Sequence, residues 1–273
     1  MNQNSKFTAL EEIITDLTKE DVAVAFSGGV DSSLLLQLCI TGAQKHHTKV
    51  HAVTFVTELQ PKEDISITER VCKEMGATHK VLYLDQLAIP EVKENHTDRC
   101  YHCKKELFSQ LIRYAHTQQV HTVIDGTNAD DMNSYRPGIR AIEELGVISP
   151  LRLAQMSKQE VRSFSKILHI SVANRPSSPC LSTRFPYNTT LDSKRIEMVG
   201  KAEDFLKTFI QGNIRVRISD FHARIECEKE AFPLLLAHND DIVSQLKALG
   251  FDFITLDLEG FRSGSMDKGQ PNK

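Results

Sequence analysis

A short run of small and acidic residues, SGGVDSS at positions 27–33, has the composition of a loop that binds an anion. The apolar run 22–26 before it predicts a buried strand, and the apolar run 34–40 after it predicts a helix. Gly28 and Gly29 allow a sharp turn and a close approach of the backbone to a ligand. A strand, a glycine turn and a helix N-terminus together present backbone N–H groups to phosphate.

The same run carries Asp31 and no lysine, so it is not the G-x-x-x-x-G-K-[ST] phosphate loop. An aspartate beside bound phosphates would repel them unless a divalent cation lay between the two. Because carboxylate oxygens suit Mg²⁺, Asp31 predicts a magnesium ion at this loop. The alternative is a tight strand-to-helix turn that contains glycines by chance.

Three of the six cysteines stand apart from the others. Cys100 and Cys103 form C-x-x-C at the start of a predicted helix over 100–116, a place that favours thiolates, and Cys180 lies in a proline-rich segment. C-x-x-C alone also occurs in zinc sites and dithiol redox motifs, and His102 could complete a Cys₃His zinc site. Three thiolates suit a [4Fe–4S] cluster with one open iron. The remaining cysteines are expected to be core thiols: Cys39, Cys72 and Cys227.

Arginines supply a second set of candidate ligand-binding residues. Arg215 and Arg217 alternate with apolar residues along a predicted strand over 214–218, so both point to one face. Converging guanidinium groups can clamp a phosphate or a carboxylate, and a solvated charged face is the alternative. Arg184 and Arg262 are further candidates.

The pattern along the chain predicts an α/β fold with a parallel sheet covered on both faces. Strands are predicted at 22–26, 50–56, 80–84 and 120–124, with helices at 8–17, 34–40, 63–75, 100–116 and 157–168. Ligands of such sheets bind beyond the carboxyl ends of the strands. The loops at 27–33, near 57 and at 125–131 are therefore expected to share one crevice, and Gly126 allows close approach to a nucleotide. The alternative at 125–131 is a polar loop that merely caps the next element of the chain.

A smaller α+β domain is predicted after this sheet. The segment 174–187 is read as an ordered loop of the active site that closes the first domain. Beyond it come a helix, strands at 214–218 and 223–227, a helical stretch to 247 and a strand at 253–258. The predicted boundaries are 1–188 for the first domain, 189–264 for the second and 265–273 for a disordered tail.

Bulk properties narrow the class of protein. The formal net charge of −3 argues against a nucleic-acid surface. The N-terminal residues do not form a signal segment and no apolar run is long enough to span a membrane, so a cytoplasmic location is expected. Disulfides are not expected in that compartment.

Several motifs resemble known families. SGGVDSS resembles the PP-loop of ATP pyrophosphatases, which grips pyrophosphate while a substrate is adenylylated. Further motifs closely resemble the LarE-type sulfur transferases of nickel-pincer cofactor biosynthesis, over nearly the whole chain. They are Cys180 with STRFPY at 182–187, RVR at 215–217, LDLxGFRSG at 256–264, and GTNADD at 126–131 with YRPG at 135–138.

That resemblance implies an activity. Members adenylylate a carboxylate of pyridinium-3,5-biscarboxylic acid mononucleotide with ATP and convert it to a thiocarboxylate. One branch has a single cysteine at the position of Cys180 and sacrifices its sulfur, and the other has three cysteines and holds a [4Fe–4S] cluster that delivers sulfide. This chain has all three cysteines and resembles the cluster-bearing branch.

The resemblance also implies roles for individual residues. Asp31 and Cys180 are expected to be catalytic, and ATP with Mg²⁺ is expected at Ala25, Ser27, Gly28, Gly29, Asp31, Ser32 and Gly126. The substrate phosphate is expected at Arg184, Arg215 and Arg217, and the cluster at Cys100, Cys103 and Cys180. A sulfide donor and a homo-oligomer are implied as partners.

Two other classes are open from the sequence. A tRNA-thiolating enzyme would share the loop and the cysteine chemistry, although it should carry a basic extension for RNA. A non-catalytic carrier of iron or nickel would leave SGGVDSS without a role.

Overall fold

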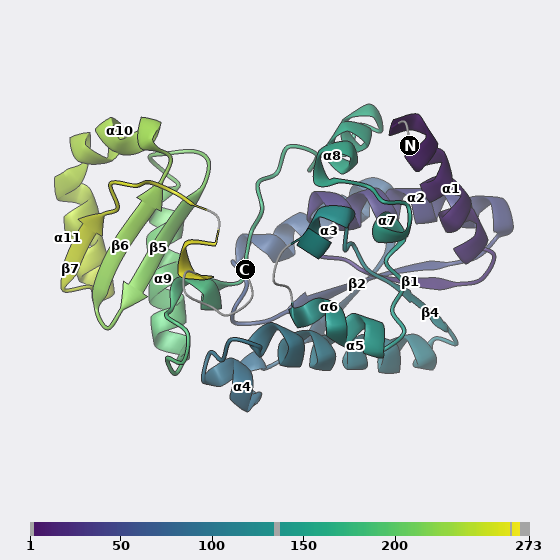
Figure 1. Cartoon of the computed structure of the whole chain (residues 1–273), viewed down its shortest axis with the longest axis horizontal. Helices are drawn as coiled ribbons and strands as arrows, with labels where there is room; N and C mark the ends of the chain where they lie inside the picture. Colours follow the sequence, from purple (N-terminus) through teal and green to yellow (C-terminus); the bar gives the residue numbers. More distant parts are fainter. Residues whose placement is uncertain (1–2, 134–136, 263, 268–273) are drawn as a thin grey trace.

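The computed structural model describes residues 3–133, 137–262 and 264–267. It has two parts that lie side by side along the long axis of the molecule, as Figure 1 shows. The first holds a four-stranded sheet and the second a three-stranded sheet. The chain passes from one to the other after the segment 174–187, which we call the cysteine segment.

The first sheet is parallel, as the alternation of strands and helices predicts. Its order is β3-β2-β1-β4, and its strands are β1 (Val22–Ala25), β2 (Val50–Val56), β3 (Thr78–Tyr83) and β4 (Thr122–Ile124). A single bridge from Ile124 to Ile148 continues it at the β4 edge. The predicted bounds of β2 match the structure, whereas β3 begins two residues before the predicted 80 and β4 two residues after the predicted 120.

Helices cover both faces of this sheet (Figure 1). One face carries α1 (Gln3–Leu17), α2 (Val30–His46), α3 (Glu63–Met75), α7 (Pro150–Leu153) and α8 (Lys158–Ile167), and the other carries α5 (Arg99–Thr117) and α6 (Pro137–Glu144). Val22 and Val24 of β1 face the first set, and Ala23 between them faces the second. Side chains alternate across a strand, so a central strand needs apolar residues at every position. The continuous apolar run at 22–26 meets that need.

Helix ends follow local chemistry. Gly76 ends α3 at the predicted place in the left-handed conformation, with a φ of 67°. Ser157 caps α8 and forms a capping box with Glu160. The four-residue helices α4 (Pro90–Lys93) and α7 were not predicted, because one turn carries too little periodicity to be recognised.

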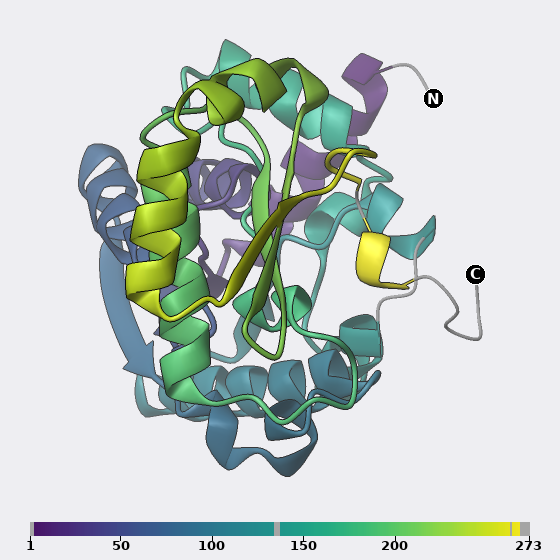
Figure 2. The same ribbon diagram turned by 90° about the vertical axis from the view of Figure 1, so that its left-hand side faces the viewer.

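The second part is the predicted α+β unit. Its sheet has the order β5-β6-β7, with β5 (Ile214–Ser219) antiparallel to β6 (His222–Cys227) and β7 (Phe253–Leu256) parallel to β6. Figure 2 shows α9 (Ser193–Leu206) and α11 (Asn239–Leu249) along one side of this sheet, and α10 (Phe232–Ala237) precedes α11. The last strand ends at Leu256, two residues before the predicted end.

The core of the second part extends into the first. Leu59 after β2 and Val92 of α4 belong to the same apolar cluster as α9 and β5. Cys103 and Cys180 pack at the edge of that cluster. Cys103 and Cys180 therefore lie at the contact between the two parts.

The predicted disordered tail began at residue 265, but its first three residues are ordered in the structure. Residues Ser265–Asp267 form a 3₁₀ turn, and Ser265 Oγ accepts a hydrogen bond from Arg217. Residues 268–273 lie outside the described part of the chain. No helix among the described residues is long and apolar enough to cross a membrane.

Candidate active site

The glycine loop, residues 27–33, connects β1 to α2 at the carboxyl end of the parallel sheet. Gly28 has a φ of 67°, a conformation that favours glycine, and a Cβ on it would lie only 3.0 Å from Cγ2 of Thr68. Ser32 Oγ donates to the carbonyl of Gly29 and accepts from the N–H of Ser27, which closes the turn on the helix N-terminus. The loop thus has the form of an anion cradle at the start of α2.

Gly126 brings the loop after β4 against the glycine loop. A Cβ on Gly126 would lie 3.1 Å from the backbone nitrogen of Ser32 and 3.2 Å from Cβ of Asp31. Asp125, next to it, accepts hydrogen bonds from Thr127 at 2.5 Å and from Ser149 at 2.6 Å. The two loops therefore approach so closely that a side chain at position 126 would push against the glycine loop.

Asp31 projects from the glycine loop into a network of polar side chains. It forms an ion pair with Lys158, the first residue of α8, and accepts a hydrogen bond from Asn128 at 3.2 Å. Lys158 was not among the predicted site residues, and it lies 127 residues from Asp31 in the chain. In the sequence, the position of Lys158 after Ser157 indicates only that a helix begins there, and not that the side chain reaches Asp31.

These loops line one cavity of about 590 Å³, the first cavity. As expected, all three strand ends contribute, since Gln60 lines it with the glycine loop and residues 125–131. Phe55 and Phe108 give it apolar walls, and Lys104 lies 3.8 Å from Asp125. Five of the seven residues expected to bind ATP line this cavity, and Gly28 and Gly29 do not. The five are Ala25, Ser27, Asp31, Ser32 and Gly126.

The three selected cysteines lie in one neighbourhood. Burial, followed by the negative charges of Cys180 and Cys100, raises the pKa of Cys103 to about 12. Gln86 donates a hydrogen bond to Cys103 Sγ at 2.7 Å, and Ser182 Oγ lies 3.1 Å from Cys180 Sγ. The cysteines expected in the core are buried: Cys39, Cys72 and Cys227.

A compact site for a single metal ion is not formed there. Among the described residues, no three His, Cys, Asp or Glu side chains are close enough together to hold one ion. His102 instead lies near Asp98 at 3.3 Å and Glu91 at 3.7 Å. A cubane cluster holds its ligand sulfurs farther apart than one zinc ion does. Three thiols are the protein ligands that a [4Fe–4S] cluster with one open iron would take.

The three predicted phosphate-binding arginines differ in their partners. Arg184 is 1% exposed and pairs through two nitrogens with Glu203, each at 2.8 Å. Arg217 pairs with Glu226 at 2.9 and 3.0 Å. Arg184 thereby fastens the cysteine segment to α9, and its guanidinium is taken up by that contact.

Arg215 has no direct ion pair among the described residues. Its guanidinium donates to the carbonyls of Ile214 at 2.6 Å and Ser177 at 3.4 Å, and lies over the ring of Phe261. Burial, followed by the charge of Arg184, lowers the pKa of Arg215 to about 10. A buried guanidinium without a direct carboxylate partner can bind an anion.

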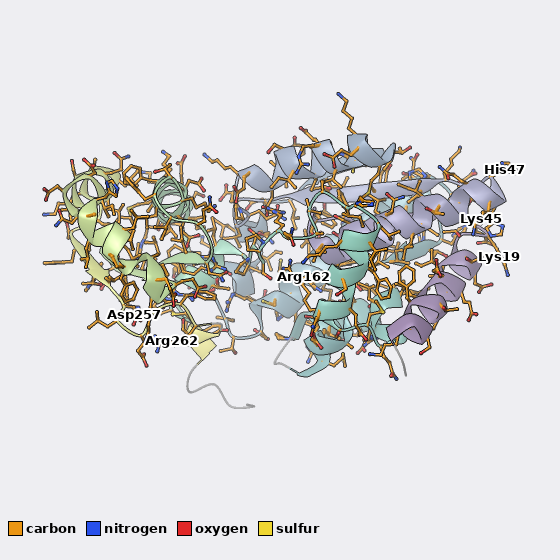
Figure 3. The ribbon with its side chains drawn as sticks, turned by 90° about the horizontal axis from the view of Figure 1, so that it is seen from above. Lys19, Lys45, His47, Arg162, Asp257 and Arg262 are labelled. Atoms are coloured by element: carbon orange, nitrogen blue, oxygen red, sulfur yellow. The ribbon has the colours of Figure 1, made fainter. Side chains whose placement is uncertain are left out.

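Arg215 and Arg217 line a second cavity of about 550 Å³. It lies between the two parts of the molecule, and Figure 3 shows Arg162 on the first part and Arg262 beside Asp257 on the second. Ser177 and Pro179 line both cavities, so the two meet at the cysteine segment, one residue before Cys180. The nucleotide cradle and the arginine cavity therefore share part of their walls, and Cys180 follows the shared Pro179 directly in the chain.

The fold and the glycine loop define a PP-loop enzyme that binds ATP. Residues 2–100 match the family model described as a PP-loop domain. The chain is 36% identical to the pyridinium-3,5-bisthiocarboxylic acid mononucleotide synthase of Lactiplantibacillus plantarum, over 96% of this chain and 94% of that protein. It belongs to the family of that enzyme, the LarE-type ATP-dependent sulfur transferases.

Two other relatives also match most of the chain. An uncharacterised protein of Synechocystis is 34% identical over 97% of each chain. An uncharacterised protein of Methanocaldococcus jannaschii is 29% identical over 89% of this chain and 91% of its own. The match thus extends well beyond the PP-loop domain into the small domain.

Proposed function

We propose that this chain uses ATP to convert a carboxylate of pyridinium-3,5-biscarboxylic acid mononucleotide into a thiocarboxylate, in nickel-pincer cofactor biosynthesis. The observation that carries the proposal is the meeting of two cavities at Ser177 and Pro179, beside Cys180. One cavity has the form of an ATP site, and the other presents an arginine without a carboxylate partner among the described residues. A substrate with a phosphate and a carboxylate can lie in the second cavity with its reacting group at the junction.

The first half-reaction would take place at that junction. A carboxylate oxygen attacks the α-phosphorus of ATP, the new O–P bond forms, and the bond to the β-phosphate oxygen breaks to release pyrophosphate. The backbone N–H groups of the glycine loop and the Lys158 ammonium face the departing negative charge. The acyl-adenylate then has AMP as a good leaving group.

Mg²⁺ fits beside Asp31. Magnesium is commonly held by one or two carboxylates together with substrate phosphates, and Asp31, Asp130 and Asp131 line the first cavity. When bound, the ion supplies positive charge to the phosphate oxygens. Asp31 would then exchange its Lys158 partner for the ion, which leaves Lys158 available for phosphate.

The substrate phosphate would bind in the second cavity. Arg215 supplies a guanidinium that no described carboxylate takes up, and Arg217 lies beside it on the same strand face. Their distance from the reacting group makes the phosphate a remote handle that positions the carboxylate. Arg184 was expected to bind the phosphate directly. Because it is paired with Glu203 and does not line the second cavity, we propose an indirect contribution instead.

In the second half-reaction, a sulfur nucleophile attacks the acyl carbon, the C–S bond forms and the bond to AMP breaks. Cys100, Cys103 and Cys180 would hold a [4Fe–4S] cluster. Bound to three thiolates, such a cluster supplies one iron without a protein ligand, where sulfide from an external donor can bind. The sulfide donor, a homo-oligomeric assembly and a cytoplasmic location stay predictions.

Anaerobic reconstitution with iron and sulfide tests the cluster. We expect about four irons per chain and broad absorption at about 400 nm. Single alanine substitutions of Cys100, Cys103 or Cys180 should reduce both, whereas Cys72→Ala, in a buried thiol of α3, should not. Iron-free protein that turns over repeatedly, or loss of sulfur from Cys180 found by mass spectrometry after one turnover, would contradict the cluster.

The substrate is tested separately, in iron-free protein. The pyridinium dicarboxylate mononucleotide should trigger release of pyrophosphate from ATP, and bulk tRNA should not. Pyrophosphate release with tRNA alone would favour a tRNA-thiolating enzyme. Absence of release with either would favour a metal carrier.

A further inference from the structure

Arg99 is a buried arginine beside the thiols that the proposed reaction does not yet use. It is the first residue of α5, directly before Cys100, and is 5% exposed. Its guanidinium lies 4.4 Å from the ring centre of Tyr187. Nε donates to Ser182 Oγ at 3.1 Å and Nη1 donates to the carbonyl of His96 at 3.3 Å. These contacts hold the group in one orientation on the wall of the second cavity.

The charge of Arg99 has no partner of opposite sign in the described part of the chain. Its Nη2 makes no hydrogen bond to any described residue, and the two acceptors of its other nitrogens are neutral. By contrast, Arg217 and Arg262 on the same cavity pair with Glu226 and Asp257. No described Asp or Glu lines this cavity. The guanidinium of Arg99 is therefore available to an anionic group of a ligand.

Arg99 is also tied to the reacting centre. Ser182 Oγ accepts from Arg99 and lies 3.1 Å from Cys180 Sγ, so one hydroxyl links the guanidinium to the thiol. Arg215 stands on β5 of the other part of the molecule and lines the same cavity. A single ligand in the cavity can therefore meet Arg215 and Arg99 with two different groups, and it can place a third beside Pro179, the residue before Cys180.

We propose that Arg99 binds the carboxylate of the substrate that is not being activated. The proposal rests on the proposed function. With the phosphate at Arg215 and one carboxylate beside Cys180, the second carboxylate of a 3,5-substituted ring lies one ring width away. A guanidinium binds a planar carboxylate through two parallel N–H groups.

This subsite explains how one active site can modify both position 3 and position 5 of the pyridinium ring. A half-turn of the ring about its bond to the ribose exchanges positions 3 and 5 and leaves the phosphate in place. Arg99 holds the second carboxylate during the first sulfur insertion and the new thiocarboxylate during the second. Both are planar anions, so one guanidinium serves both rounds.

A nucleotide with one carboxylate tests the subsite. Pyridinium-3-carboxylate mononucleotide lacks the group that Arg99 would bind, and pyrophosphate release in iron-free protein gives a KM for each nucleotide without the cluster. Unmodified protein should prefer the dicarboxylate by about 10- to 100-fold, the range of a hydrogen-bonded charge pair. In Arg99→Met the preference should disappear, because only the dicarboxylate loses a contact.

Two further variants keep the test decisive. Arg99→Lys retains the positive charge but not the two parallel N–H groups, so it should retain part of the preference for the dicarboxylate. This variant still tests the subsite if Arg99→Met does not fold. Arg262→Met, which removes a paired arginine from the same cavity, should leave the preference unchanged.

Three results would overturn the subsite. They are a preference that persists in Arg99→Met, an equal rise in both KM values, and no preference in the unmodified protein. The second would give Arg99 a structural role through Ser182. Release of pyrophosphate with neither nucleotide would remove the proposed function itself, and the inference with it.

Discussion

Arg175 Nη1 donates a hydrogen bond to the carbonyl oxygen of Gly28 at 3.2 Å, and its Nη2 pairs with Asp64 of α3. The carbonyl of Gly28 and the N–H of Gly29 belong to one trans peptide and point in opposite directions. Holding the carbonyl toward Arg175 therefore turns the Gly29 N–H toward Ser27 Oγ, which it meets at 3.4 Å. The cysteine segment thus sets the orientation of a peptide in the glycine loop.

Loss of this contact should weaken ATP binding. In Arg175→Met we expect the KM for ATP to rise about tenfold, the effect of one hydrogen bond to a charged group, with the KM for the mononucleotide unchanged. Pyrophosphate release at varied ATP measures both. Arg70→Met, at an exposed arginine of the neighbouring helix α3, is the matched control. An unchanged KM for ATP would show that Arg175 does not position the loop.

Asp31→Asn should abolish most AMP formation. The neutral amide keeps the size of the side chain and loses the charge that would hold Mg²⁺ at the phosphates, so a fall of roughly 100-fold or more is expected. The rate of AMP formation is measured with each protein in the presence of ATP and the mononucleotide substrate. Asp16→Asn, an exposed position on α1, should have no effect. Undiminished AMP formation would remove Asp31 from the mechanism.

Arg184 and Arg215 should respond differently to the same substitution. Arg184→Met leaves Glu203 buried without its cation and should lower the free energy of unfolding by about 3–5 kcal/mol. Arg215→Met strands no carboxylate among the described residues and should instead raise the KM for the mononucleotide. Urea unfolding and pyrophosphate release measure the two effects. A stable Arg184→Met that loses only nucleotide binding would reverse these roles.

Two histidines of the first domain should make stability depend on pH. Burial lowers the pKa of His51 and of His79 below the ordinary 6.5. Well above pH 6.5 both histidines are neutral in the folded and in the unfolded chain. As the pH falls through 6.5, they bind protons in the unfolded chain, whereas in the folded chain they do so only at lower pH. Stability should therefore decrease from about pH 7.5 to about pH 5.5, and less so in His79→Gln. Equal urea midpoints across this range would contradict the expectation.

Much of the fold could be predicted from local patterns. The apolar runs in β1 and β2 and the amphipathic period of α3 report burial directly, and Gly76 marks a helix end through its left-handed conformation. The anion-binding glycine loop could be predicted equally well, because the residues that define it are seven consecutive positions in the chain. Short helices such as α4 were missed, since one turn shows no period.

The sequence by itself determined the glycine loop, the parallel sheet and the separation of three cysteines from the three core thiols. The tertiary structure decided which charges are paired. Lys158 reaches Asp31 across 127 positions, Glu203 takes up Arg184, and Arg99 and Arg215 are left without direct carboxylate partners among the described residues. Whether two charged side chains form an ion pair depends on the distance in space between segments that are far apart in the chain. Residue types and their spacing in the sequence do not determine that distance.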